Sequence, residues 1–318
     1  MCRMKIKSPF FADAFVLLVA IAALTLTACG EKKATTFTLR LIGNRTCPLA
    51  AALDVVCANS DLAAQHQLHL PVQLTQDFES IQRIVAANDA DAALVPAAQA
   101  VILLSANPDW RLRADLGPTR RVFLIALSSA PQLPRDLINF AGEEGLIALE
   151  YWRRTQPGVE LKSIVAHKPP PNYRPQFLPP GDILFTTSEP LNVTLVTRPD
   201  LRMVIGLEEH LLLLVNRRYA RQHGELVDAL LSVLCATPMS ALRKNTIFLE
   251  RIADLLGATV AWTQTQLAGL SLNGSDEAAC RKSVELSAGE KQNLEALVAA
   301  GMQAGVIRRA FSLGDAIW

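Results

Sequence analysis

Apolar residues recur along the chain with two different periods, and the two periods take turns between residues 37 and 106. A period of two predicts a strand, and a spacing of three or four residues predicts a helix. The predicted elements are a strand over 37–43, a helix from 48 past 57, a strand over 68–74, a helix over 77–89, a strand over 91–96 and a helix over 97–106. Strands that alternate with helices predict a parallel sheet covered by helices on both faces.

Four residues at the predicted ends of these elements support the same assignment. Pro48 suits the first position of a helix, and Asp77 is the predicted N-cap of the next one. Pro71 favours an edge strand because proline has no backbone N–H to donate. Pro96 is expected to end its strand for the same reason.

The rest of the chain begins with strands and ends with helices. Further strands are predicted over 121–129, 159–167, 182–190 and 201–206, with one helix within 140–154. The proline-rich residues 168–181 are predicted to form a surface connection. Later helices are predicted over 217–236 and 287–305, the second with a capping box of Ser287 and Glu290 and a stop at Gly305.

The first 28 residues have the layout of a secretory signal peptide. Three basic residues within the first seven positions precede an apolar run over 14–28. That run has 15 residues, whereas a membrane-spanning helix needs about 20. The four residues 26–29, Leu-Thr-Ala-Cys, resemble the bacterial lipoprotein signal, which implies cleavage before Cys29 and acylation of that residue. The alternative is an ordinary cleavage after Ala28 that leaves a free cysteine.

Composition limits the remaining 290 residues to one large domain or two ordinary ones. Half of all residues are apolar, which is enough for a sizeable core. Residues 1–28 carry three of the 31 basic residues and one of the 30 acidic ones, so the remainder is nearly neutral. We therefore expect neither a nucleic-acid partner nor a polybasic membrane face.

Four cysteines follow Cys29, and an exported protein can pair them. A helix between Cys47 and Cys57 would hold them about 15 Å apart, whereas bridged Cα atoms lie about 4.4–6.8 Å apart. That pair is therefore not expected. A bond between Cys235 and Cys280 and a set of four free thiols both remain open.

The sequence carries few motifs of catalysis. It contains no CxxC, HExxH, GxSxG, P-loop or GxGxxG pattern and only five histidines. His66 and His69 are three residues apart, but they flank the end of a helix and the start of a strand. We expect no metal site, no cofactor and no enzymatic activity.

Three stretches resemble type II periplasmic-binding proteins of the nitrate, sulfonate, taurine and thiamine-precursor type. They are IGNRTCPLAAALDVVCANSDLAAQHQLHLPVQL over 42–74, GDILFTTSEP over 181–190, and LLLLVNRRYARQHGELVDALLSVLCA over 211–236. The C-terminal residues 297–318 also suit the closing helices of that family. The segment PRDLINFAGEEGLIALEYW, residues 134–152, departs from the family by being shortened.

The resemblance implies an α/β fold of two lobes, with parallel-dominated sheets, flanking helices and a hinge between the lobes. It implies a signal peptide over 1–28, a tether over 29–36, the first part of lobe 1 over 37–120, lobe 2 over 121–205, and a return to lobe 1 with C-terminal helices over 206–318. A ligand is then expected between the lobes, outside the carboxyl ends of the strands.

Polar residues in the turns after the strands are the candidate ligand contacts. They are Asn44, Arg45, Thr46, Gln99, Ser128, Thr186, Thr187 and Glu189. Arg45 precedes a helix N-terminus, where N–H groups and an arginine together suit a carboxylate, sulfonate or phosphate. The alternatives are a solvated Arg45, a simple turn at Thr186 and Thr187, and a hinge salt bridge at Glu189. The aromatic residues Trp110, Tyr151 and Trp152 are expected to pack in the core.

The function that these expectations favour is solute capture for import. A lipid-anchored binding protein would present a small ligand to an ABC permease and its ATPase at the extracytoplasmic face of the membrane. A small organic anion is the first expectation and a heteroaromatic vitamin precursor the second. A sensor or assembly lipoprotein without transport is the alternative. An enzyme of the same fold is less expected, because relatives that make vitamin precursors work in the cytoplasm.

The lipoprotein signal yields a direct test. In a bacterial host grown with labelled palmitate, we expect the full chain to incorporate the label and a Cys29→Ala variant to lose it, because the thiol is the acylated group. Label that persists in the Cys29→Ala variant would contradict the assignment.

Overall fold

The computed structural model describes most of the chain that follows the predicted tether. The described residues are 37–45, 47–127, 132–156, 161–170, 183–188, 200–270, 272 and 276–318. Internal contacts separate Met1–Phe37 from Thr38–Trp318, and the architecture given below is that of the second unit. The signal peptide, Cys29 and the tether lie outside the described residues.

The secondary structure follows the predicted order of elements. The strands are β1 (Phe37–Thr38), β2 (Leu41–Asn44), β3 (Leu68–His69), β4 (Val72–Thr75), β5 (Ala92–Pro96), β6 (Trp110–Leu127), β7 (Asp136–Asn139), β8 (Val165–His167), β9 (Ile183–Ser188) and β10 (Arg202–Asn216). The helices are α2 (Pro48–Asn59), α3 (Leu62–Gln65), α4 (Phe78–Ala87), α5 (Ala97–Ala106), α6 (Gly142–Thr155), α8 (Arg217–Gln222), α9 (Gly224–Ala236), α10 (Met239–Leu242), α11 (Thr246–Leu256), α12 (Val260–Gly269), α13 (Glu277–Ser283), α14 (Ala288–Gln303) and α15 (Leu313–Ala316).

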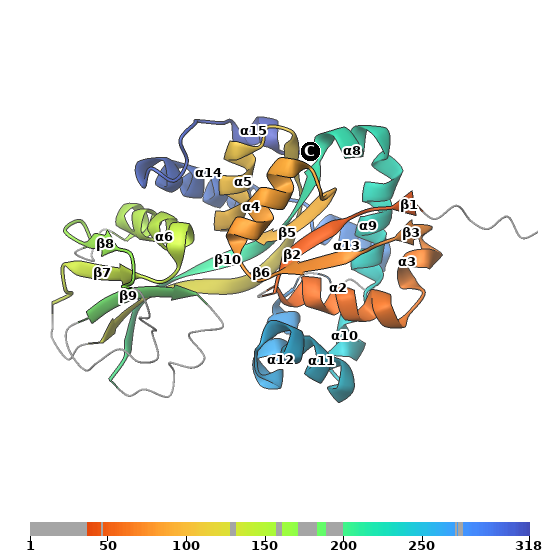
Figure 1. Ribbon diagram of the computed structural model, residues 1–318, viewed down its shortest axis with the longest axis horizontal. Helices are drawn as coiled ribbons and strands as arrows, with labels where there is room; N and C mark the ends of the chain where they lie inside the picture. The colour runs from red at the N-terminus through yellow and green to blue at the C-terminus, as the bar shows by residue number, and fades with distance from the viewer. Residues whose placement is uncertain are drawn as a thin grey trace, which may run out of the picture. The chain divides into compact units, whose positions relative to one another are not determined.

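One sheet of eight strands organises these elements, in the order β4-β2-β5-β10-β6-β9-β7-β8 (Figure 1). Strands β4, β2 and β5 run parallel to one another at one end of the sheet, and β9, β7 and β8 run parallel at the other end. Strands β10 and β6 lie between the two ends, and their pairings with β5, with each other and with β9 are antiparallel.

The two central strands connect the ends of the sheet. Strand β6 has 18 residues and β10 has 15, and they pair along most of their length. The sequence predicted only their parts at 121–129 and 201–206. Residues 110–120 contain alternating charges with Gly117 and Pro118, a composition that hid the strand. The ladder tolerates these residues because its register shifts at several places, as β-bulges allow.

Alternation along the strands sends neighbouring side chains into two different cores. Leu211 and Leu213 of β10 pack on one face with helices α2, α9 and α11. Leu212 and Leu214 pack on the opposite face with helices α4, α5, α6 and α14. The predicted cover of helices on both faces is therefore confirmed, and Trp110 and Trp152 are core residues as expected.

Two predicted strands are each split into two. Residues 37–43 form β1 and β2, because the backbone N–H of Arg40 donates to the carboxylate of Asp91 at 2.9 Å and leaves the strand pattern. Residues 68–74 form β3 and β4 around Pro71, which cannot donate a backbone hydrogen bond. Strand β4 lies at the edge of the sheet, as Pro71 predicted.

Two other predictions of length were wrong. The helix expected over 217–236 is divided into α8 and α9 at His223, whose backbone, with φ −139° and ψ 49°, is not helical. Of the strand expected over 159–167, the described part forms a strand only at Val165–His167. The proline-rich prediction falls mainly on residues 171–181, which lie outside the described residues.

The predicted helix ends are confirmed with one exception. Asp77 accepts a hydrogen bond from the N–H of Ser80 at 2.7 Å, and Pro48 begins α2. Gly305 has a φ of +71° just after α14, which glycine adopts readily. Ser287 caps α14 by accepting from the N–H of Glu290 at 3.1 Å, but within the described residues the Glu290 side chain does not return the bond.

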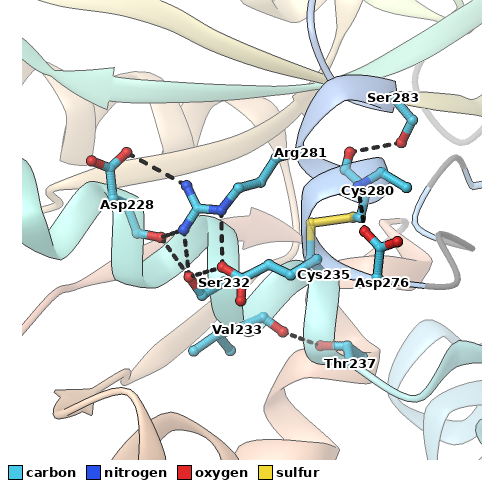
Figure 2. The surroundings of a disulfide bond; sticks show 11 residues. Asp228, Ser232, Val233, Cys235, Thr237, Asp276, Cys280, Arg281 and Ser283 are labelled. Carbon is cyan, nitrogen blue, oxygen red and sulfur yellow. Dashed lines mark hydrogen bonds and ion pairs between the residues drawn. A yellow bond between two sulfur atoms is a disulfide. The ribbon is translucent and has the colours of Figure 1, made fainter.

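A disulfide bond joins α9 to α13 through Cys235 and Cys280, which decides between the two alternatives left open by the sequence (Figure 2). Beside it, the guanidinium of Arg281 donates to the hydroxyl of Ser232 at 2.5 Å and to the backbone carbonyl of Asp228 at 2.9 Å. The same two helices are therefore held by a covalent bond and by a polar network.

The two other cysteines that the structure describes are free. Cys47 is buried and Cys57 is half-buried. Burial raises the pKa of each thiol to about 11. Within the described part of the chain, no helix combines the length and apolar character needed to cross a membrane.

Loss of the disulfide is expected to destabilise the protein substantially. The bond closes a loop over a sequence separation of 45 residues, so a Cys235→Ala/Cys280→Ala double variant should lose about 2–4 kcal/mol of unfolding free energy in urea. A reductant should lower the stability of the wild type to that of the variant and leave the variant unchanged. A wild type that does not respond to the reductant would contradict the bond.

Candidate functional site

Two helices begin next to the central strands, at the carboxyl ends of β5 and β7. Helix α5 follows Pro96 directly, and α6 begins at Gly142 shortly after β7 ends at Asn139. A helix N-terminus carries unpaired N–H groups and a partial positive charge. The two helices pack against β10, and they also contact each other. The carboxyl ends of strands are where open α/β sheets bind their ligands.

The first turn of α5 is capped by a residue far away in sequence. Its N-cap is Pro96, which has no side-chain acceptor. Instead, Oε1 of Glu209 on β10 accepts from the N–H of Ala98 at 3.0 Å. The other oxygen, Oε2, accepts from Nε of Arg120 on β6 at 2.9 Å. Glu209 is only 1% exposed, so both of its oxygens are committed inside the protein.

The first turn of α6 contributes a second carboxylate. Oε2 of Glu144 accepts from Nη2 of Arg120, and its Oε1 accepts from Nε2 of Gln99 on α5. Gln99, Arg120, Glu144 and Glu209 thus form one buried unit, called here the Arg120 cluster. It links α5, β6, α6 and β10, and it contains Gln99, one of the residues predicted as a ligand contact.

The Arg120 cluster contains one cation and two carboxylates, so its protonation matters. Burial raises the pKa of Glu144, and the charge of Glu209 raises it further, although Arg120 and Gln99 act in the opposite direction. Burial alone would lower the pKa of Arg120, but the two carboxylates outweigh it and the pKa is raised. The cluster therefore keeps the arginine charged, and Glu144 gives up its proton less readily than a solvent-exposed glutamate does.

Gln99 has one unpaired atom in this cluster. Oε1 of Gln99 is buried without a hydrogen-bond partner among the described residues. The oxygen and nitrogen of a glutamine amide are interchangeable by rotation. A rotated amide would turn Oε1 toward Glu144, but it would also place Nε2 in the unpaired buried position, where that nitrogen would need an acceptor.

Thr186 supports the turn that carries Glu144. Its hydroxyl donates to Oδ1 of Asn139 at 2.5 Å, and Nδ2 of Asn139 donates to the carbonyl of Gly142 at 2.6 Å. Gly145 approaches Thr186 so closely that a Cβ there would lie 2.8 Å from the hydroxyl. Thr187 is fully buried on the same strand, β9.

The structure places the residues of the turn after β2 in different surroundings. Asn44 is buried at the end of β2, and Cys47 is the buried N-cap residue of α2, close enough for the charge of Arg120 to lower the pKa of its thiol against burial. Arg45 is exposed and lines a cavity of about 380 Å³ with residues of α2 and α11, including Asp54 and Arg251. Arg45 is thus outside the Arg120 cluster.

Three predicted residues, Thr46, Ser128 and Glu189, lie outside the described residues. The sequence analysis in turn missed Arg120, Glu144 and Glu209. Arg120 directly precedes the strand that was predicted, and Glu144 lies near the start of the helix predicted within 140–154, so neither residue stands in a turn after a strand. The available signal was Glu209, a charged residue directly before the apolar run over 211–215 and separated from it only by His210.

A second polar cluster lies on the face of the sheet that carries α14. Asp115, His210 and Glu290 each offer one ligand atom, and these atoms lie within 4.8 Å of one another. A hydrogen bond with Asp115 raises the pKa of His210, against burial, and Glu290 and Glu208 act in the same direction. These three residues could hold a metal ion. His210 and Glu290 also line a cavity of about 360 Å³ together with Tyr151 and Trp152.

Comparison with known proteins shows similarity at the level of the fold. No model of a protein family matches the chain, and no curated protein sequence matches it. The periplasmic aliphatic sulphonate binding protein SsuA of Escherichia coli is a similar solved structure, with a TM-score of 0.66, 10% identity, and coverage of 88% of this chain and 92% of that one.

Two further solved structures show the same likeness. The alkanesulfonate-binding protein SsuA of Xanthomonas axonopodis pv. citri, bound to MOPS, has a TM-score of 0.64 and 15% identity over 88% of this chain and 98% of its own. The CA3427 gene product of Candida albicans, described as having the generic periplasmic binding protein fold, has a TM-score of 0.60 and 10% identity over 89% and 96%. The chain therefore has the periplasmic-binding-protein fold, and the expected fold class is confirmed.

The raised pKa of Glu144 predicts a specific pH dependence of stability. The folded protein binds this proton more tightly than the unfolded chain does, so the contribution of Glu144 falls as pH rises above about 4.3. A Glu144→Gln variant has no titrating group at this position, so its stability does not fall with pH for this reason. Its unfolding free energy in urea should therefore improve relative to wild type as pH rises, by at most about 1.4 kcal/mol per pH unit within the window.

Glu143 is the matched control, since it lies in the same helical turn but is exposed. A Glu143→Gln variant should keep the wild-type pH profile. A constant difference between Glu144→Gln and wild type from pH 4 to pH 8 would contradict a perturbed Glu144.

Proposed function

We propose that this protein is a solute-binding protein that captures a small ligand outside the inner membrane and delivers it to an ABC permease and its ATPase. The periplasmic-binding-protein fold supports this proposal, because the solved structures that share it include sulfonate-binding components of importers. The protein would bind without chemistry. Its proposed lipid anchor is Cys29, for which the lipoprotein signal of the sequence is the support.

The proposed ligand position is the place where the N-termini of α5 and α6 meet the Arg120 cluster. This convergence is the observation on which the proposal rests, since a buried arginine and two helix N-termini are all suited to negative charge. The proposed lobes are 37–120 with 206–318, and 121–205, and their limits fall within or beside β6 and β10. These two strands would act as the hinge.

A small organic anion remains the first choice of ligand, and a heteroaromatic vitamin precursor the second. The carboxylate of Glu144 already occupies one side of Arg120, so an anionic ligand would take the place of that carboxylate. The raised pKa of Glu144 means that its carboxylate is protonated more readily, and protonation would lower the electrostatic cost of this exchange. Gln99, Thr186, Thr187 and Asn44 are the proposed polar contacts, and Arg45, Thr46, Ser128 and Glu189 are proposed to surround them.

One observation favours a second candidate, a sensor or assembly lipoprotein that does not transport. The charges of the Arg120 cluster pair with one another without any ligand. A protein of this fold that no longer takes part in import would also retain a cluster whose charges pair with one another. The Candida albicans gene product is described by its periplasmic binding protein fold. A fold alone does not determine function.

A thermal-shift screen tests the proposed binding. The full chain is heated with alkanesulfonates, small carboxylates and thiamine precursors, each at millimolar concentration. A ligand present at 100 times its Kd adds about 2.7 kcal/mol of stability and should raise the midpoint by several degrees.

Variants then locate the ligand. For an anionic hit, Glu144→Gln should bind more tightly, by about tenfold, because it removes the charge that competes for Arg120, and Arg45→Ala should bind more weakly. Glu143→Gln should bind like the wild type. A hit that all these variants bind equally would contradict the proposed position, and a screen without a hit in wild type and in Glu144→Gln would contradict binding of these ligand classes.

A further inference from the structure

Three side chains from distant parts of the sequence meet on the α14 face of the sheet. Asp115 is on β6, His210 is on β10, and Glu290 is in the first turn of α14. Nδ1 of His210 lies 2.9 Å from Oδ2 of Asp115 and 3.6 Å from Oε2 of Glu290. One imidazole nitrogen therefore faces two carboxylates.

Irregularities in the strand ladder place two of these side chains. The register between β10 and β6 shifts on both sides of His210, which lies opposite Pro118. Gly117 has a φ of +91°, and its N–H donates to Oδ1 of Asp115 at 2.9 Å. Bulges of this kind re-aim side chains and occur next to functional sites.

Glu290 is directed to the same point. A capping box would turn its carboxylate back to the N–H of Ser287. In the described part of the chain that return bond is absent, and the carboxylate faces His210 instead. Glu290 therefore does not complete the capping box of α14, and its carboxylate becomes the third member of the group around His210.

The charges at this point suit a positive centre, which either a protonated His210 or a bound cation supplies. A neutral imidazole would turn a lone pair or a single proton toward two carboxylates, and Glu208 adds a further negative charge nearby. The group is also accessible, because His210 and Glu290 line a cavity of about 360 Å³. The surface pair of His167 and Asp136, at 2.8 Å, has no third ligand among the residues that the structure describes and resembles an ordinary exposed ion pair.

We propose that Asp115, His210 and Glu290 bind a divalent first-row transition metal such as Zn²⁺, with Nδ1 of His210 and one oxygen of each carboxylate as ligands. Zn²⁺ accepts this combination of nitrogen and oxygen donors, and a nitrogen ligand disfavours Mg²⁺ and Ca²⁺. The donor atoms already lie within 4.8 Å of one another, so small side-chain movements would bring them to bonding distance. Three protein ligands leave a coordination position open toward the cavity.

Titration of the full chain with Zn²⁺ after treatment with a chelator tests the site. Isothermal calorimetry should show one bound ion per chain. Bound Co²⁺ should give the visible absorption of a metal site with a low coordination number. Mg²⁺ should not compete. Each of His210→Gln and Glu290→Gln should weaken Zn²⁺ binding at least about tenfold, since even the loss of an outer-shell partner of a metal site costs 10–100-fold.

Two controls make the result decisive. His167→Ala removes the exposed His–Asp pair, and His66→Ala/His69→Ala removes the other candidate pair; both should leave Zn²⁺ affinity unchanged. Glu290→Gln keeps the backbone cap of α14, and its thermal midpoint reports that it is folded. Absence of Zn²⁺ binding to the folded wild type, or binding that the His66/His69 variant abolishes and Glu290→Gln does not change, would overturn the proposal. Solute binding in the thermal-shift screen is a separate result and decides neither outcome.

Discussion

The burial of Arg120 is the constraint on which the centre of the molecule depends. A guanidinium that is 6% exposed is stable inside a protein only when its charge is balanced and its N–H groups are bonded. Glu209 and Glu144 meet both requirements from two different elements. Because Glu209 also caps α5 and Glu144 belongs to the first turn of α6, the same charge fixes where both helices begin. Removing Arg120 would leave two buried carboxylates without a cation, which is far more costly than never having placed these groups there.

Under the proposed function, this arrangement would couple ligand binding to movement of secondary structure. The Arg120 cluster spans α5, β6, α6 and β10, so a change in its bonding would act on two helices that pack against the central strand β10 and against each other. Strands β6 and β10 are paired along most of their length and are interrupted only by register shifts. In a two-lobed protein, such shifts are natural places for bending because the ladder is already incomplete there. Under the proposed function, a ligand would compete with an internal carboxylate, and opening of the site would depend on the outcome of that competition.

The sequence predicted the elements well wherever local signals determine them. Pro48, Asp77 and Gly305 define helix ends through backbone chemistry that does not depend on distant residues, and all three were placed correctly. The alternation of strands and helices likewise predicted the layered α/β fold. What could not be predicted depends on partners far away in sequence. The length of β6 follows from its pairing with β10, and the break after Leu39 follows from the bond between Arg40 and Asp91. The candidate site was predicted least well. Gln99 was found because it follows a strand, whereas Arg120 and Glu144 become important only through contacts with residues 24 or more positions away in sequence.

The disulfide between α9 and α13 relates the structure to the compartment in which the chain folds. Disulfides form in oxidising compartments and are rare in the reducing cytoplasm, so a chain that has not been exported would lack this closure. The two other described cysteines are poor competitors for it, because thiols with a pKa of about 11 are scarcely ionised and attack slowly. Once the chain has folded beyond the membrane, exchange of the Cys235–Cys280 bond with Cys47 or Cys57 would therefore be slow, and the bond would persist.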